Sequence, residues 1–413
     1  MYVHDELVAG AGSDEVLAAW KTVQPFLSED ARQGGVLDAT SIQLIAAEVG
    51  VAVSRKEAQQ ALVEMDANQD GKADKEEFLQ WWMDSGKSTV GRLLTSVINK
   101  AGQNTKYLPG ISLGDNVHAV PDLLQAAEKA DMLVFVTPHQ FIPGVLGKLK
   151  GKIKPNARAI SLVKGMEITP DGFNLISKVI ERELDIKCSV LMGANIAQEI
   201  AEGRFSECTV GAETTADREA WLRLFNTPLF QTRGTSDVPA VEMCGTLKNV
   251  VAIGAGFIDG LEEGNNAKAA IMRVGFSEMI KLIKRAYPET SDATFLESCG
   301  IADLITTCYG GRNRKCAEAF VQRGGKATFD DIEEELLAGQ KLQGVLTSNE
   351  VQELIESWGD GAEKEFPLMV TINRIIRGDI PPGDIVRYAE MPSKEDYADE
   401  GRRVVLRKQG STS

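Results

Sequence analysis

The feature that most restricts the fold of this chain is an alternation of short apolar runs with helical stretches, which ends near residue 238. The runs are rich in β-branched and aromatic residues and comprise 131–139, 157–165, 188–195 and 206–212, with a shorter strand expected at 116–122. This alternation is typical of a largely parallel sheet covered on both faces. Beyond residue 238 only helical patterns remain, at 266–286, 328–338 and 347–358. The sequence therefore predicts an α/β domain followed by an all-α domain.

The stretch VVAIGAGFIDGLEEG, at 250–264, imitates the glycine-rich turn of a dinucleotide-binding fold. That turn requires the spacing G-x-G-x-x-G, whereas Gly254, Gly256 and Gly260 are spaced G-x-G-x-x-x-G. The stretch is better explained as part of one long apolar helix that begins near residue 238. We expect its glycines to allow the close approach of neighbouring helices or of a ligand.

The first 84 residues or so are acidic, helical in pattern and free of strand signals. Between two helical stretches lies DANQDGKADKEE, 66–77, which fits a calcium-binding loop position by position, with Gly71 at the sharp turn. Oxygen ligands are expected from Asp66, Asn68, Asp70, the Lys72 carbonyl, Asp74 and Glu77. The alternative is a solvated acidic turn, which the glycine and the flanking helices disfavour.

A second segment of similar outline, DARQGGVLDATS at 30–41, lies about 36 residues upstream. Arg32 and Gly34 stand where ligands belong, and Ser41 replaces the terminal glutamate. This loop resembles a degenerate EF-hand, which would pack against its neighbour without binding metal. We therefore expect an EF-hand pair with one calcium ion per chain.

Composition excludes several classes of partner. The formal charge of −15 argues against nucleic acid or an anionic membrane, although a basic pocket for an anionic substrate remains compatible with it. We find no apolar run long enough to span a membrane, and the start MYVHDELVAG is unlike a signal or transit peptide. The 6 cysteines are scattered singly, which fits a reducing compartment and predicts a cytoplasmic protein.

A series of motifs follows a short polar linker, in which GKST lacks the strand and first glycine of a phosphate-binding loop. The motifs are KYLPG (106–110), VTPHQF (136–141), SLVKG (161–165), VLMGANIAQEIA (190–201), GTLKNVVAIGAGF (245–257), ESCGIADLITTCYGGRNRK (297–315) and KLQG (341–344). Through them, residues 95–390 closely resemble NAD-dependent glycerol-3-phosphate dehydrogenase of the eukaryotic cytosolic type. The resemblance implies hydride transfer between NADH and dihydroxyacetone phosphate, giving sn-glycerol 3-phosphate, and a homodimer.

The chemistry explains the residue types that the resemblance marks as catalytic. Reduction of a ketone places negative charge on its oxygen, so a cationic acid must donate a proton there. By resemblance this acid is Lys248, while Lys164 polarises the same oxygen and Asp303 orients the lysines. Two neighbouring ammonium groups lower each other's pKa, which favours acid chemistry near neutral pH.

The resemblance also assigns residues to the substrate and the coenzyme. Asn195, Thr307, Arg312 and Asn313 would bind the substrate, because a phosphate dianion favours a planar, bidentate arginine. The coenzyme would contact Phe141, Lys164, Ala197, Arg312, Lys341 and Gln343.

Taken alone, most of these residues have structural explanations. A single lysine such as Lys248 is usually a solvated helix residue, and Asp303 would more often be a helix cap. The surrounding motifs reverse that judgement for Lys164, Lys248, Asp303, Arg312 and Asn313. His139 remains a histidine that simply satisfies its hydrogen bonds at a strand end.

One part of the family's fold has no counterpart. The family begins with a strand, a G-x-G-x-x-G turn, a helix and a second strand, which grip the coenzyme pyrophosphate. Here Gly102, Gly110 and Gly114 are too widely spaced to form that turn. Three hypotheses follow: a calcium-controlled dehydrogenase that holds NADH with the remaining half-site or another chain, a coenzyme-deficient calcium sensor or subunit partner, or an incomplete form of a full-length enzyme.

The expected organisation is multidomain, with an all-α EF-hand pair, an incomplete doubly wound Rossmann-like sheet, and an all-α substrate and dimerisation domain. The boundaries are an EF-hand pair at 1–84, a linker at 85–94, a coenzyme domain without its first βαβ unit at 95–237, a helical domain at 238–395 and a tail at 396–413.

Overall fold

The computed structural model describes residues 36–38, 40–41, 55–66, 72–73, 95–105, 107–169, 172–325, 327–337, 342–359 and 361–393. They divide into two compact units. One unit comprises Met1–Asp131 and Gln140–Pro155, and the other comprises Met132–His139 and Asn156–Ser413. Each unit is described by itself.

The first unit contains the helices α4 (Arg55–Met65), α7 (Leu123–Ala127) and α8 (Ile142–Leu149). An isolated antiparallel bridge joins Leu37 to Ala73, with backbone N–H···O distances of 2.7 and 3.0 Å. The strand predicted at 116–122 is wrong, since these residues form no strand. The reason is local: the side-chain amide of Asn99 bonds both the N–H and the carbonyl of Ala119, at 2.8 Å each, in place of a neighbouring strand.

The second unit is built on a five-stranded sheet in the order β1-β2-β5-β6-β7. The strands are β1 (Met132–Phe135), β2 (Arg158–Ser161), β5 (Cys188–Met192), β6 (Ser206–Gly211) and β7 (Phe230–Thr235). Only the β5–β6 pairing is antiparallel, so the prediction of a largely parallel sheet is confirmed. Among the described residues, β1 pairs with β2 alone and therefore ends the sheet.

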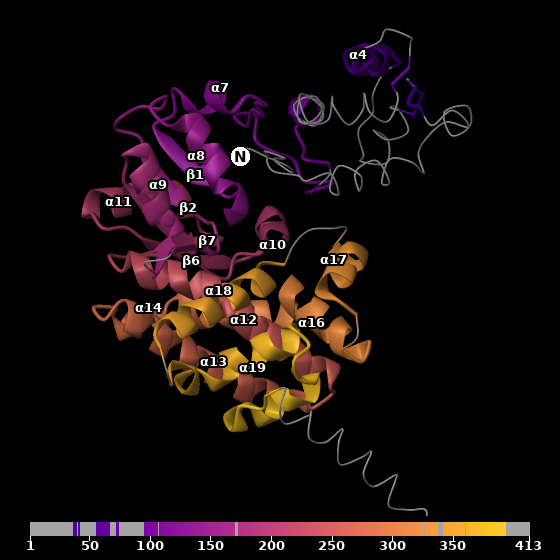
Figure 1. Cartoon of the computed structure of the whole chain (residues 1–413). Helices are drawn as coiled ribbons and strands as arrows, with labels where there is room; N and C mark the ends of the chain where they lie inside the picture. Colours follow the sequence, from indigo (N-terminus) through magenta and orange to yellow (C-terminus); the bar gives the residue numbers. More distant parts are fainter. Residues whose placement is uncertain are drawn as a thin grey trace, which may run out of the picture. The chain divides into compact units, whose positions relative to one another are not determined.

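Helices cover both faces of this sheet. Strand β5 shows the arrangement, because alternate residues of a strand point to opposite faces. Leu191 packs with Trp221 of α11 (Thr215–Phe225), whereas Val190 and Met192 pack with the start of α12 (Val238–Gly260). Helix α9 (Ile176–Leu184) also packs against β5 and β2, and the short helix α10 (Ala197–Ala201) follows β5 in the chain (Figure 1).

Two elements of this unit have no counterpart in the sequence prediction. Strand β7 lies at the edge of the sheet and none of its residues is buried, so it lacks an apolar run. The antiparallel pair β3 (Met166–Thr169) and β4 (Gly172–Leu175) is too short for a clear alternation. The sequence Thr-Pro-Asp-Gly at 169–172 is a turn signal that could have revealed this pair.

Helix α12 is the centre of the all-α domain, as the long apolar stretch predicted. It packs against several of the helices drawn in orange and yellow in Figure 1. These and the other elements of the domain are α13 (Gly264–Ala286), α14 (Asp292–Phe295), the π-helical turn η4 (Ser298–Ala302), α15 (Asp303–Gly310), α16 (Arg312–Gln322), α17 (Phe329–Leu337), α18 (Gln343–Ser357), η5 (Ala362–Glu365), α19 (Pro367–Ile376) and η6 (Pro382–Glu390).

The glycines of α12 serve helix packing. A Cβ atom on Gly254 would meet the Ile372 side chain at 2.8 Å, and one on Gly256 would meet the carbonyl of Arg314 at 2.3 Å. The sequence has no uninterrupted apolar run of membrane-spanning length. Within the described part of the chain, α12 alone is long and apolar enough by average composition to cross a membrane, yet its apolar window is wholly buried in the protein. It is the core helix of the domain.

Candidate active site

Lys248 lies in the middle of α12, where its side chain is almost completely buried. Its ammonium group donates hydrogen bonds to the Asp303 carboxylate and, over 2.8 Å, to the hydroxyl of Thr307. Burial lowers the pKa of Lys248 to about 7, with the nearby Lys164 ammonium acting in the same direction and Asp303 opposing both. The site thus contains an amine that gives up its proton near neutral pH, as a general acid requires.

Lys164 lies just beyond the carboxyl end of β2, in the segment that leads to β3. The neighbouring Gly165 donates its backbone N–H, over 3.0 Å, to the hydroxyl of Thr246, which lies two residues before Lys248 on α12. This bond ties the strand end to the central helix and brings the two lysines to one place. The Lys164 ammonium lowers the pKa of Lys248, so the two cations lie close together, and their catalytic role stays a prediction.

Asn195 lies in the turn after β5, at the same edge of the sheet. Its amide nitrogen contacts the Cys208 sulfur at 3.2 Å. The turn is held by Ser298, whose hydroxyl accepts from the Ala194 N–H at 3.2 Å and donates to the Glu207 carbonyl at 2.9 Å. Gly193 permits this approach, because a Cβ atom there would lie 2.7 Å from the Cys208 Cα.

Arg312 and Asn313 begin α16. The Arg312 side chain is exposed, whereas Asn313 is buried. Asn313 donates its side-chain N–H to the side-chain oxygen Oδ1 of Asn249 over 3.0 Å and accepts the backbone N–H of Gly344 over 3.1 Å. Asn313 therefore connects the helix of Lys248 to the first turn of α18, where Gln343 lies.

The remaining predicted positions lie on other elements. Phe141, in the first unit, ends the 3-10 turn η3 (His139–Phe141), and Ala197, in the second unit, is exposed at the start of α10. Lys341 lies outside the described residues, as do the predicted calcium ligands Asn68, Asp70, Asp74 and Glu77. Asp66 and Lys72 are described, and the described residues contain no cluster of acidic, histidine or cysteine side chains that could hold a metal.

The structure adds residues that the sequence reasoning did not assign. Thr246, Asn249 and Ser298 hold the segments that carry the lysines, Asn195 and Gln343. Each lies inside one of the motifs quoted above, and only its hydrogen-bond partners distinguish it from its neighbours. His139 also belongs here, since it bonds Gln343 and faces Glu350 of α18.

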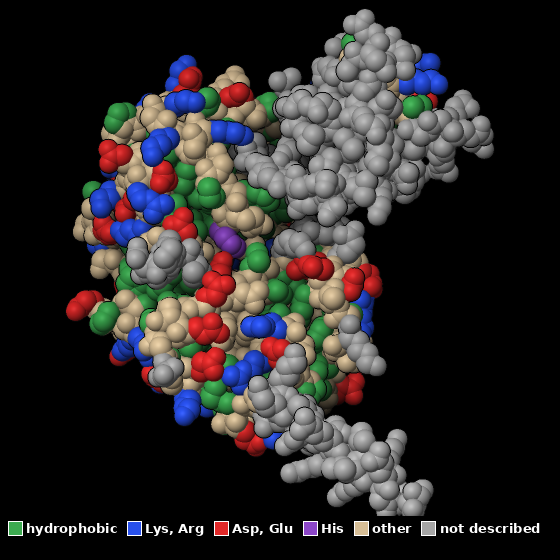
Figure 2. Space-filling view, viewed as in Figure 1, with side chains coloured by type: hydrophobic (Ala, Val, Ile, Leu, Met, Phe, Trp, Pro, Cys, Tyr) green, Lys and Arg blue, Asp and Glu red, His purple; other side chains and the backbone are tan. Residues whose placement is uncertain are grey.

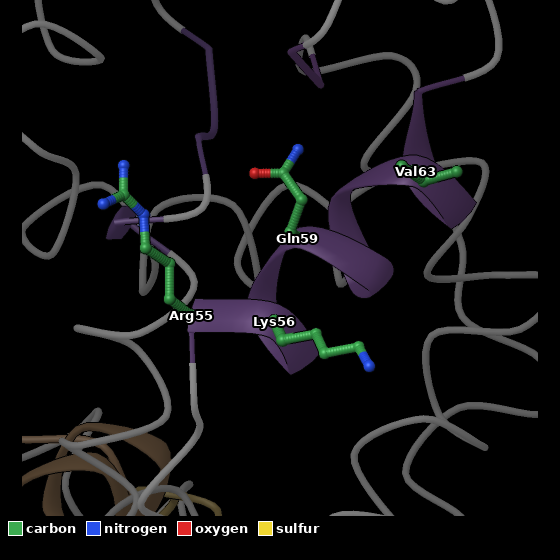
Figure 3. A pocket seen from close by; sticks show the side chains of 4 residues that line it. All are labelled: Arg55, Lys56, Gln59 and Val63. Atoms are coloured by element: carbon green, nitrogen blue, oxygen red, sulfur yellow. The ribbon is translucent and has the colours of Figure 1, made fainter.

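Two surface features are not part of this site. Figure 3 shows a hollow lined by Arg55, Lys56, Gln59 and Val63, all exposed and all on α4. None of the predicted catalytic side chains lines it. Figure 2 shows lysine and arginine interspersed with aspartate and glutamate on the face in view, so the net charge of −15 is not gathered there.

A mainly parallel sheet with lysine and asparagine at its carboxyl edge, followed by an all-α domain that contributes a buried Lys–Asp pair, defines a Rossmann-like, coenzyme-dependent oxidoreductase. Two family profiles match the chain, the N-terminus of NAD-dependent glycerol-3-phosphate dehydrogenase over residues 68–217 and the C-terminus over residues 237–387. The chain belongs to the NAD-dependent glycerol-3-phosphate dehydrogenase family.

Individual relatives agree with this assignment. "Glycerol-3-phosphate dehydrogenase [NAD(+)] 1, chloroplastic" of Arabidopsis thaliana is 55% identical over 73% of this chain and 75% of its own. The human enzyme named cytoplasmic is 50% identical over 72% of this chain and 84% of its own. The solved structure of DsGPDH of Dunaliella salina superposes with a TM-score of 0.70 and 50% identity, covering 73% of this chain and 53% of that one.

Proposed function

We propose that this protein reduces dihydroxyacetone phosphate to sn-glycerol 3-phosphate with NADH, and catalyses the reverse reaction. The observation that carries the proposal is Lys248, buried between Asp303 and Thr307 with a pKa of about 7. A buried amine of this kind can donate a proton to a ketone oxygen and later take it back. The family membership supports the choice of coenzyme and substrate.

The described residues fit the reacting half of such a complex. One oxygen of Asp303, Oδ2, is buried without a hydrogen-bond partner, which leaves it available to hold a donor within the site. Lys164, Asn195 and Thr307 contribute further donors toward the same region. NADH, when bound, would supply the hydride that attacks the carbonyl carbon.

The protein's own residues then supply the proton. Lys248 donates it to the carbonyl oxygen while Lys164 stabilises the negative charge that develops there. Asp303 accepts a hydrogen bond from the Lys248 ammonium and keeps that group directed at one point. Burial of Lys248 excludes water from the donor. Arg312 and Asn313, at the start of α16, would bind the substrate phosphate.

The test is the substitution Lys248→Met, which keeps the length of the side chain and removes its proton. We expect turnover to fall by about 10²- to 10⁴-fold. Lys268→Met is the matched control, because Lys268 is also buried and bonds an aspartate, Asp259, at 2.7 Å, but is not among the residues assigned to the site. Turnover per folded protein that stays near normal in Lys248→Met, or falls equally in both variants, contradicts the assignment.

The pH dependence gives a second test. Since the acid must be protonated, reduction should decline as the pH rises through about 7, the pKa of Lys248. Oxidation of glycerol 3-phosphate needs the free amine and should increase over the same interval. A rate of reduction that stays constant between pH 6 and 8 would exclude Lys248 as the proton donor.

We further propose that the N-terminal segment is an EF-hand pair that binds one calcium ion in the loop 66–77. The bridge between Leu37 and Ala73 supports this, because each residue is the eighth of its predicted twelve-residue loop. Helix α4 ends at Met65, directly before Asp66. In the other loop, Ser41 donates its hydroxyl to Asp38 over 2.7 Å, which suits a loop without metal.

Calorimetry with calcium should reveal one site, in the range of roughly 10⁻⁷ to 10⁻⁵ M that is usual for sensor loops. Glu77→Gln should abolish most of the binding, and Ser41→Ala, in the other loop, should leave it unchanged. The fluorescence of Trp81 and Trp82, directly after the loop, should report the binding. Two equivalent sites, or no heat at all, would contradict the proposal.

We also propose that the protein acts as a cytoplasmic homodimer. The described cysteines are all free and buried, as suits a reducing compartment, and relatives are named cytoplasmic or chloroplastic. The dimer follows from the family resemblance. Light scattering at micromolar concentration and fractionation of the source cells test the two statements.

A further inference from the structure

His139 lies at the start of η3, between the end of β1 and helix α18. Its Nδ1 atom is 3.0 Å from Oε1 of Gln343, and its Nε2 atom is 3.3 Å from Oε1 of Glu350. The two partners are seven residues apart, two turns of α18, and so they share one face of that helix. The side chains of His139 and Glu350 are 13% and 16% exposed, so solvent reaches this contact only slightly.

The ring also contacts the segment that carries Lys164. It bonds the backbone of Lys164, and it lies directly against Gly165, whose φ is +137°. A Cβ atom at Gly165 would be only 2.6 Å from the ring Nδ1. His139 therefore joins two segments of the candidate site, the strand end with Lys164 and the first two turns of α18.

In the arrangement of the structure the oxygens of Gln343 and Glu350 face the two ring nitrogens. A ring protonated on both nitrogens satisfies both acceptors, whereas a neutral ring can donate to only one of them. Burial lowers the pKa of His139, but the bond and charge of Glu350, with the bonds to Gln343 and to the Lys164 backbone, outweigh it and raise that pKa above 6.5. Glu350 is the charged side chain that meets the ring, while Lys164 meets it through its backbone.

We propose that His139 is a positioning residue whose imidazolium, paired with Glu350, clamps α18 against the segment of Lys164 and so couples proton binding to the geometry of the active site. The effect of this clamp on catalysis rests on the proposed function. Asn313 also holds the first turn of α18, because its side-chain oxygen accepts the backbone N–H of Gly344. The clamp adds a charge-assisted contact that depends on pH.

The sign of the pH effect follows from the direction of the shift. A histidine with a raised folded-state pKa contributes stability that is complete below its ordinary value of 6.5. That contribution is lost as the pH rises through the folded-state value. The clamp should therefore be closed in mildly acidic solution and released in mildly alkaline solution.

The direct test is an NMR titration of protein labelled with ¹⁵N in its histidines. The chain has 3 histidines. The signals that disappear in the spectra of His139→Gln and His118→Gln are assigned to those two residues, and the remaining signals belong to the third. We expect the His139 ring to carry protons on both nitrogens at pH 6 and to titrate above 6.5. Glu350→Gln should lower that midpoint, whereas His118→Gln, an exposed loop residue, should not move it.

Kinetics test the consequence for catalysis. For reduction of dihydroxyacetone phosphate at pH 6, His139→Gln should lower kcat/KM by about 10-fold, mostly through KM, because Lys164 and Gln343 lose their common anchor. The ratio of wild type to variant should approach one as the pH rises to 9. Lys248 titrates in both proteins, so its effect on the rate cancels in this ratio. His118→Gln should behave as wild type.

The outcomes separate the clamp from the proposed function. A His139 ring that is neutral between pH 6 and 9, or a midpoint that Glu350→Gln leaves unchanged, overturns the clamp whatever the activity. A constant ratio of kcat/KM across the pH range overturns its catalytic role. If the wild-type protein fails to reduce dihydroxyacetone phosphate, the proposed function fails, while the titration still decides whether the clamp exists. Should His139→Gln not fold, Glu350→Gln carries the kinetic comparison.

Discussion

Replacing Glu242 by glutamine should stabilise this protein at alkaline pH, although it removes a hydrogen-bonded carboxylate. Glu242 lies on α12, fully buried, and accepts hydrogen bonds from the Ser177 N–H at 3.1 Å and the Ser177 hydroxyl at 2.5 Å. Burial raises the pKa of Glu242 from 4.5 to about 7, because the bonds from Ser177 offset only part of the lost hydration.

The size of the effect follows from this pKa. The difference between 4.5 and about 7 corresponds to roughly 3 kcal/mol in the free energy of unfolding. Because the folded-state pKa is raised, the contribution of Glu242 to the stability of the protein is greatest below pH 4.5. That stability is lost as the pH rises through about 7, where the folded protein must accept a buried negative charge.

Urea unfolding at pH 5 and at pH 8 measures the effect. Glutamine keeps an acceptor for the Ser177 N–H and offers a donor to its hydroxyl, but it never ionises. We expect Glu242→Gln to resemble wild type at pH 5 and to be more stable at pH 8, by up to about 3 kcal/mol. Glu278 is a second buried carboxylate with a pKa of about 7. Both proteins contain it, so its contribution to the pH dependence cancels in the comparison.

The matched control is Glu213→Gln. This carboxylate is partly exposed and bonds Lys178 and Lys187, which lower its pKa to about 2. It stays ionised from pH 5 to pH 8 in the folded protein, so its substitution should have nearly the same effect at both. Equal effects of Glu242→Gln at pH 5 and 8, or destabilisation at pH 8, would refute the reasoning, since they would mean that Ser177 compensates fully for burial.

Three further substitutions test the site. Asp303→Ala should shift the decline of reduction to a lower pH, since Asp303 raises the pKa of Lys248. Below the new pKa the buried ammonium has lost its counter-charge, and there urea unfolding should show a loss of stability of about 3–5 kcal/mol. Gly193→Ala should lower the stability of the protein by about 1–3 kcal/mol, because the added Cβ is overpacked against Cys208. Thermal unfolding measures this loss, and Gly147→Ala, with no atom within 4 Å of the added Cβ, should not show it. Asn313→Ala removes the bond to the first turn of α18 and should raise the KM for NADH more than it lowers kcat, in steady-state kinetics.

The arrangement of the main elements could be predicted from sequence, because apolar patterns report burial directly. The runs at 131–139, 157–165, 188–195 and 206–212 became β1, β2, β5 and β6, and the stretch from residue 238 became α12. The spacing of the glycines at 250–264, together with their place in a long apolar stretch, excludes a dinucleotide-binding turn, and in the structure Gly254, Gly256 and Gly260 pack against other helices. Strand β7 and the β3–β4 pair were not predicted, because an edge strand without buried residues and a hairpin with strands of four residues carry little apolar signal.

The sequence by itself proposed Lys248, Lys164, Asp303, Asn195 and Asn313 as site residues, because each lies in a motif that resembles the family. Only the tertiary structure could decide how they act together. The pKa of Lys248 depends on burial inside α12 and on two charges from distant segments, which no local pattern records. His139 shows the same limit: its role depends on Gln343 and Glu350, more than 200 residues away in the chain, and on a glycine that leaves room for its ring. Residue types determine which chemistry is available, whereas the electrostatic environment of each group exists only once the chain has folded around it.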